Sequence, residues 1–144
     1  MTKAIPFDDL AAFAVLVETG FGQWGQATAI SAKQADDFAR VTGVAAQDGM
    51  LPGCMLQSLL PRLVPTPTWI VEGHSGALNL GAPTTRFPCP VAVGASVQGR
   101  SRLAAAREHP RGTILGMEFE MREPGANGPC MRSLIEVLYL GGRP

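Results

Sequence analysis

Three residues that could take part in chemistry lie close together between positions 48 and 58. Gly53 follows Pro52 and opens an apolar segment with helical spacing, and the free amides at the start of a helix readily bind oxyanions. The simpler interpretation of Gly53 is structural: a glycine permits a tight turn where the chain enters the helix. Asp48 is the carboxylate of the preceding loop, although an Asp before Gly49 is more often a turn former. Ser58 is polar within the apolar helix, and its hydroxyl could bond to a carbonyl one turn earlier.

Histidines and cysteines are few, and their spacing predicts neither a metal site nor a disulfide framework. His74 is the histidine with a route to a cleft, and an exposed loop position is the alternative, whereas His109 beside Pro110 is typical of a turn. The sequence lacks the C-x-x-C or H-x-x-x-H spacing that supplies a zinc site. The odd count of three cysteines favours a reducing compartment. Cys54 could be a reactive thiolate at a helix start, but a small buried thiol is the favoured interpretation.

The composition predicts a globular chain without a strong long-range field. Among 144 residues, twelve basic side chains balance twelve acidic ones, 17% are charged and 46% are hydrophobic. This balance argues against binding to nucleic acid or to an anionic membrane surface. A local phosphate site remains open, because several arginines gather in the second half: Arg86, Arg100, Arg102, Arg107 and Arg111.

The amino-terminal apolar run at 10–17 superficially resembles a signal peptide. Asp8 and Asp9 precede it, Glu18 ends it, and it is too short to span a bilayer. We therefore expect an amphipathic helix at about 6–19 and a cytoplasmic protein.

The elements that must position the candidate residues begin with helices. Trp24 to Ile30 alternates weakly, which predicts a short strand. Ser31 with Gln34 forms a capping-box pattern for a second helix, which carries Ala35, Phe38 and Val41 on one face and ends near Gly43. The apolar segment from about 53 to 64 predicts a buried central helix, with a kink or a tightened turn caused by its internal proline.

The second half of the chain is strand-like. The clearest period-two pattern places one apolar row against charged neighbours: Leu115, Met117, Phe119 and Met121 alternate with Glu118, Glu120 and Arg122. No linker or internal repeat divides the chain, so we expect one α+β domain over 1–144.

Several motifs occur in an order that resembles the MaoC-like hydratases and dehydratases, and in particular the mycobacterial 3-hydroxyacyl-thioester dehydratases. The best of them is R-F-x-x-P-V-x-x-G from Arg86 to Gly94, and the others are G-Q-W at 22–24, Q-x-x-D-F-A-x-x-T-G at 34–43 and S-L-L-P at 58–61. The resemblance implies a single hotdog fold, in which a curved antiparallel sheet wraps around a central helix. It also implies a homodimer, or pairing with a related hotdog subunit.

The same resemblance indicates what kind of ligand the chain binds more clearly than which reaction it catalyses. Members act on acyl-coenzyme A or acyl-carrier thioesters through an Asp and a His, in a pattern like D-x-x-x-I-H between T-G-D and H-G. Here Val44 follows Thr42-Gly43, and Pro52-Gly53 stands where H-G is expected, so the catalytic segment is missing. The Gly53 amide is the expected donor to the thioester carbonyl, with Asp48 and His74 as substitutes for the lost pair. Substrate-binding residues are expected at three further positions: Arg86, Asn79 and Ser58. Arg86 could instead pair with an acidic residue across the sheet.

Three hypotheses remain open at this stage, because one fold hosts several activities. The chain could be a hydratase or dehydratase with a relocated acid/base pair, a non-catalytic thioester-binding protein or partner subunit, or a hotdog thioesterase. The second is favoured, with weak or no hydratase activity, so whether the chain is an enzyme at all stays uncertain. No metal or resident cofactor is expected, coenzyme A entering only as part of the substrate.

Overall fold

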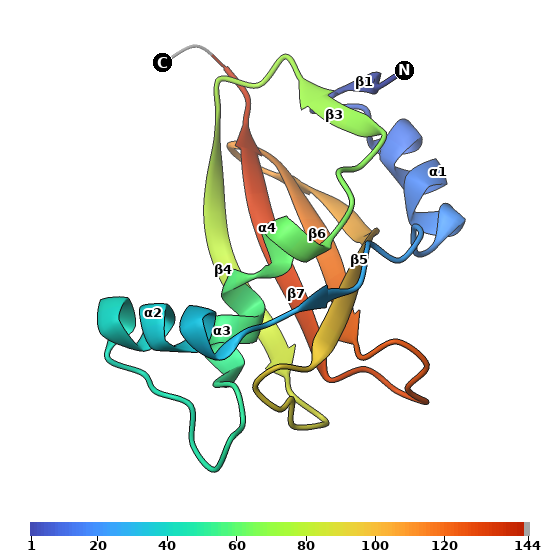
Figure 1. Cartoon of the computed structure of the whole chain (residues 1–144). Helices are drawn as coiled ribbons and strands as arrows, with labels where there is room; N and C mark the ends of the chain where they lie inside the picture. Colours follow the sequence, from blue (N-terminus) through green and yellow to red (C-terminus); the bar gives the residue numbers. More distant parts are fainter. Residues whose placement is uncertain (143–144) are drawn as a thin grey trace.

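A curved antiparallel sheet of five strands forms the body of the structure. The computed structural model describes residues 1–142, and the strand order in the sheet is β2-β5-β6-β7-β4 (Figure 1). The expected α+β architecture of a curved antiparallel sheet around central helical segments is confirmed. The strands are β2 (Thr28–Ala29), β4 (Gly76–Arg86), β5 (Ser96–His109), β6 (Gly112–Arg122) and β7 (Met131–Leu140).

The period-two pattern of β6 separates an inner apolar face from an outer charged face. Met121 is fully buried and packs with the central helices, whereas its neighbour Glu120 accepts hydrogen bonds on the opposite face. The outer face carries ion pairs between strands, at 2.7 Å for Arg100–Glu120 and 3.0 Å for Arg132–Glu120. Because successive side chains of a strand point to opposite faces, one alternating sequence builds both surfaces.

The central helix predicted at 53–64 is present as two short helices, α3 (Gly53–Ser58) and α4 (Leu60–Leu63). The break falls at Leu59, just before Pro61, which has no N–H with which to continue the hydrogen-bond ladder. The predicted kink is therefore confirmed. The helices lie against the inner face of the sheet (Figure 1), and their buried residues are Met55, Leu56, Leu60 and Leu63.

The amino-terminal helix begins later than the sequence pattern predicted. Helix α1 covers Leu10–Thr19, because residues 3–6 form strand β1 (Lys3–Pro6), which pairs in parallel with β3 (Trp69–Glu72). Asp9 caps α1 by accepting from the Ala12 amide at 2.9 Å. In residues 1–142, no helix is long and apolar enough to cross a membrane. Of the strand expected over 24–30, only Thr28–Ala29 forms a strand, β2.

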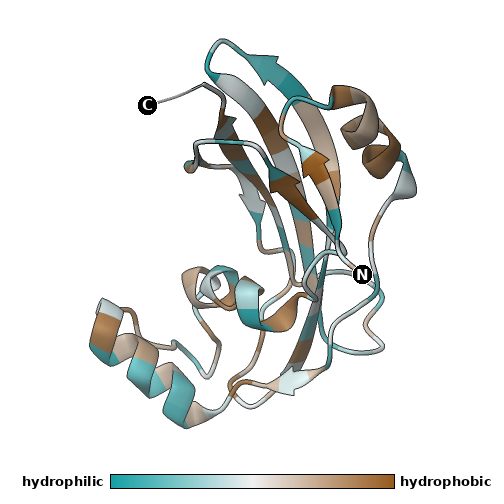
Figure 2. Ribbon diagram, turned by 90° about the horizontal axis from the view of Figure 1, so that it is seen from above, coloured by the Kyte–Doolittle hydropathy of each residue, from teal (hydrophilic) through white to brown (hydrophobic). Residues whose placement is uncertain are grey.

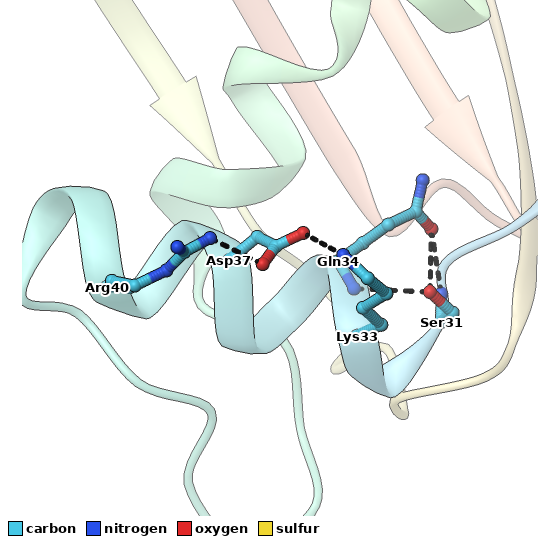
Figure 3. Close-up of polar contacts among 5 residues, drawn as sticks. All are labelled: Ser31, Lys33, Gln34, Asp37 and Arg40. Atoms are coloured by element: carbon cyan, nitrogen blue, oxygen red, sulfur yellow. Dashed lines mark hydrogen bonds and ion pairs between the residues drawn. The ribbon is translucent and has the colours of Figure 1, made fainter.

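Helix α2 (Ala32–Thr42) has the predicted capping box. The Gln34 amide donates to Ser31 Oγ at 3.1 Å, and Gln34 Oε1 accepts from the Ser31 amide at 2.9 Å (Figure 3). Along the exposed side, Asp37 bridges Lys33 and Arg40 at 2.8 and 2.7 Å. The hydrogen bond from Lys33 lowers the pKa of the Asp37 carboxyl.

The hydropathy of the two outer helices differs. In Figure 2, α1 is mostly brown, whereas α2 alternates between teal and brown. Phe13 of α1 is completely buried in a cluster with Leu103 and Leu115 of the sheet. Of the apolar row predicted on α2, Ala35 is buried, but Val41 is 83% exposed because the end of the helix extends beyond the sheet (Figure 1).

We predict that Met121→Ala lowers the free energy of unfolding by about 2–5 kcal/mol, because Met121 is fully enclosed between the sheet and the central helices. Phe119→Ala should cost less, since Phe119 is only half-buried and borders a cavity. Urea denaturation of both variants measures the difference. A larger loss for Phe119→Ala would contradict the placement of Phe119 at the edge of an open cavity.

Candidate functional site

The inner face of the sheet is not completely covered by the central helices, and a cavity of about 690 Å³ remains beside them. Its floor is formed by β5, β6 and β7, and its walls by the end of α3, the start of α4, the following loop and β3. Most of the side chains around it are apolar, as in typical small-molecule sites. They include Leu60, Val64, Ile70, Val71, Met117, Phe119 and Ile135.

A few polar side chains also border this cavity, which we call the helix cavity. The His74 and Tyr139 rings meet edge to face at 5.0 Å, and burial raises the pKa of the Tyr139 hydroxyl. The Nδ1 atom of His74 is buried without a hydrogen-bond partner in the described structure. Ser58 Oγ donates to the Met55 carbonyl at 2.7 Å, the predicted bond to the preceding turn. The structure thus brings His74 and Ser58 to the same cavity.

Gly53 lies away from that cavity, at the opening of α3. A Cβ atom at this position would come within 2.9 Å of the Phe87 ring. The absence of a side chain therefore allows the central helix to pack closely against the R-F-x-x-P-V-x-x-G segment. This contact explains the glycine structurally, and its role towards a thioester carbonyl stays a prediction.

Asp48 is exposed and forms part of a tight turn. It has φ of 52°, Gly49 follows with φ of 74°, and the Met50 amide donates to the Gln47 carbonyl at 2.8 Å. Two consecutive residues with positive φ are typical of the turn that joins paired strands. The geometry supports the turn-forming interpretation, and Asp48 does not border the helix cavity.

Asn79 and Arg86 both lie on strand β4, also outside the helix cavity. Asn79 Oδ1 accepts from the Gly81 amide at 2.8 Å, where the register of β4 against β7 shifts. Arg86 is paired in register with Arg132 and borders a shallow hollow of about 340 Å³ on the outer face. The sheet therefore separates Arg86 from His74 and Ser58 within one subunit.

The cysteines show no sign of a reactive centre. Cys54 and Cys89 are exposed, so the favoured interpretation of Cys54 as a buried thiol was wrong. Cys130 is buried, its Sγ lies 3.4 Å from the Met121 carbonyl, and burial raises the pKa of its thiol to about 11. In residues 1–142, no group of three or more His, Cys, Asp or Glu side chains is placed to hold a metal ion.

The sequence analysis missed several polar residues of the cavity, among them Gln57 and Ser101. Gln57 Nε2 donates to Ser133 Oγ at 3.3 Å, and Ser133 in turn shares a hydrogen bond of 2.9 Å with Thr85. Both residues carry a recognisable signal. Gln57 interrupts the apolar central helix, and Ser101 occupies an inward position of β5, where an apolar residue would otherwise be expected.

Comparison with known proteins agrees with the motifs. The 3-hydroxyacyl-thioester dehydratase Z of Mycobacterium tuberculosis is 39% identical over 62 residues, which cover 43% of this chain and 40% of the relative. The MaoC-like dehydratase from Rhodospirillum rubrum superposes with a TM-score of 0.58 at 14% identity, over 84% of this chain and 90% of that one. The chain has the MaoC-like hotdog fold.

The predicted resemblance to MaoC-like hydratases and dehydratases is thereby confirmed. A subunit of the ChsH1-ChsH2 complex from Mycobacterium tuberculosis superposes with a TM-score of 0.69 at 9% identity, over 91% of this chain and 95% of that one. No family model matches the chain. Because this chain spans about 40% of the length of the dehydratase it resembles in sequence, that relative's activity does not transfer directly.

Proposed function

We propose that this MaoC-like hotdog protein binds the acyl chain of a coenzyme A or carrier-protein thioester in the helix cavity. The observation that carries the proposal is the cavity itself, with its apolar walls and a few polar groups at its edge. Its volume of about 690 Å³ lies within the usual range for small-molecule sites, about 300–1,000 Å³. Coenzyme A enters the proposal only as part of the ligand, and no resident cofactor is required.

Hydratase activity should be weak or absent. Adding water to an enoyl thioester requires a base for the water and an acid for the α-carbon. The described residues around the helix cavity include His74 and Tyr139 but no carboxylate. Val44 also occupies the position after Thr42-Gly43 where the family has its Asp.

One observation favours a second candidate, a hydratase with a rebuilt site. His74 borders the cavity, and its buried Nδ1 makes no hydrogen bond within the described chain. An imidazole could transfer a proton in both directions, so activity that depends on His74 is the alternative to binding alone. A thioesterase that uses Asp48 has less support, because Asp48 is exposed in a turn.

We further propose that β4 pairs with β4 of a second copy or with a related hotdog subunit. Strand β4 is the long edge of the sheet and is exposed along most of its 11 residues. Leu78, Leu80 and Phe87 are 42%, 48% and 43% exposed along and just beyond it. A long apolar edge strand invites pairing with another strand. The similarity to a subunit of a two-protein complex agrees with this arrangement.

Dodecanoyl-coenzyme A should bind the protein, and coenzyme A alone should bind at least about tenfold more weakly (~1.4 kcal/mol), because the acyl chain fills the helix cavity. Ile135→Trp should weaken the acyl ligand by about tenfold or more, since Ile135 faces the cavity. Calorimetry measures both effects. Leu134→Trp is the matched control on the same strand, because Leu134 borders the outer hollow instead.

A protein that gives no heat and no thermal shift with any acyl chain length would contradict acyl binding. A structural or partner role would then be the better explanation. Equal weakening by Ile135→Trp and Leu134→Trp would show that binding occurs elsewhere.

Loss of crotonyl-coenzyme A absorbance should be negligible under conditions in which an active hydratase is rapid. A missing acid/base group commonly costs about 10²–10⁴-fold in rate, and both expected groups are missing. The assay uses wild type, His74→Gln and Asp48→Asn. Rapid turnover that His74→Gln abolishes would establish the rebuilt site, while Asp48→Asn serves as a control at an exposed turn.

Light scattering at micromolar concentration should show a dimer of this chain, and Leu80→Lys should shift it towards monomer by placing a charge on the edge strand. Val15→Lys is a control of the same type, since Val15 is 62% exposed on α1. A monodisperse wild-type monomer would rule out the dimer and leave only pairing with a different subunit.

A further inference from the structure

The helix cavity has polar side chains at each of its two ends along β7. At one end lies Gln57 of α3, whose side chain is hydrogen-bonded to Ser133 of β7. His74 and Tyr139 border the same cavity at the other end. Tyr139 lies six residues beyond Ser133 on the same strand, a separation of roughly 20 Å at about 3.3 Å per residue.

The floor between these two ends is mainly apolar. Ile135 lies between Ser133 and Tyr139 on the inner face of β7, because alternate residues of a strand share a face. Met117 is its register partner on β6, and Phe119 of the same strand also borders the cavity. A ligand lying along β7 would therefore pass over hydrocarbon side chains before it reached His74 and Tyr139.

The backbone holds His74 and Tyr139 together at the end of β7. Gly73, with φ of 74°, turns the chain after β3, and the Ser75 amide donates to the Leu140 carbonyl at 2.8 Å. These two features place the His74 ring edge to face against the Tyr139 ring, with 5.0 Å between the ring centroids. The pair is thus positioned before any ligand binds.

The hydrogen-bonding atoms of this pair differ in what surrounds them. Within residues 1–142, His74 Nδ1 is enclosed by protein and has no partner, whereas His74 Nε2 and the Tyr139 hydroxyl are neither enclosed nor bonded to another protein group. A buried N–H without an acceptor is rarer in proteins than a buried acceptor without a donor, so the proton of the neutral imidazole belongs on Nε2. The pair therefore offers two donors to the cavity, Nε2–H and the phenolic O–H.

We propose that the ligand of the helix cavity is an acyl thioester whose far end carries an oxygen atom, a hydroxyl or a carbonyl, which accepts hydrogen bonds from His74 and Tyr139. A purely hydrocarbon chain reaching this end would displace water and leave both donors unpaired, which is unfavourable. The inference rests on the proposed function and names its substrate class. It also gives His74 a role remote from the thioester, unlike the proton transfer of the rebuilt-site alternative.

The test compares 12-hydroxydodecanoyl-coenzyme A with dodecanoyl-coenzyme A by calorimetry. The wild-type protein should bind the hydroxylated ligand about tenfold more tightly. Tyr139→Phe and His74→Phe keep the two rings in contact and remove only hydrogen-bonding atoms, and each should reduce this preference to about threefold or less. The double variant should bind the two ligands within about twofold of each other.

Thr113→Val is the matched control. Thr113 is buried and is the register partner of Tyr139 on β6, but it does not border the helix cavity. Removing its hydroxyl should therefore leave the tenfold preference unchanged. A preference that Thr113→Val abolishes as fully as Tyr139→Phe would show a general loosening of the strand ends and would overturn the inference.

Two further outcomes would overturn the inference while leaving acyl binding intact. One is equal wild-type affinity for the two ligands, and the other is a preference that survives in the double variant. Short ligands give an independent check, because a four-carbon chain does not span the apolar floor. A preference for 4-hydroxybutanoyl-coenzyme A over butanoyl-coenzyme A as large as that for the long pair would place hydroxyl recognition near the thioester and would also overturn the inference. A wild-type protein that binds neither long ligand would instead overturn the proposed function.

Discussion

The packing of two short apolar helices into one end of a curved sheet determines the rest of this structure. Met121 lies beneath the helices and is fully buried, whereas Met117 and Phe119, further along the same strand, are only half-buried. The difference arises because α4 ends at Leu63 and the chain leaves the sheet as the loop at 65–68. A longer, unbroken helix would have filled the inner face. The end of α4 at Leu63 therefore leaves part of the inner face uncovered, and the cavity lies there.

The outer face of the sheet is constrained by charge instead of by apolar packing. Its charged side chains neutralise one another across strands, so that Glu120, 5% exposed, is paired with both Arg100 and Arg132. This pairing is needed because a buried carboxylate without a partner would strongly destabilise the fold. Arg100 also lies 4.3 Å from the ring centroids of both Phe21 and Trp24, which attaches the segment after α1 to the sheet. Gly22 and Gln23 of that segment also border a hollow beside Ser101 and Met117, so contacts on the outer face help to position a wall of the inner face.

The sequence predicted those parts of the structure that depend on local pattern. The capping box at Ser31, the kink at Pro61 and the alternation of β6 follow from neighbouring residues, and all three are present. The start of α1 was wrong, because residues 3–6 pair with β3, a partner more than sixty residues away. Val41 was placed on a buried face because helical spacing does not show where a helix extends beyond the sheet.

The same distinction between local pattern and long-range packing applies to the candidate site. Ser58 and His74 reach the helix cavity, but the sequence could not show that Arg86 lies on the outer face, because strand register sets that position. Likewise, the ring of Phe87 against Gly53 joins two segments that are distant in the chain. The family motifs predicted the fold. The position and size of the cavity depend on tertiary packing between distant segments, which a local motif does not encode.

The most direct test of the account is the place where the acyl chain binds. In a methyl-labelled sample titrated with dodecanoyl-coenzyme A, the NMR signals of Met117 and Ile135 should shift, and those of Leu134 on the outer face should remain unchanged. Shifts confined to Leu134 and its surroundings, or saturating binding without any shift at Met117 and Ile135, would contradict an acyl site between the broken helix and the sheet.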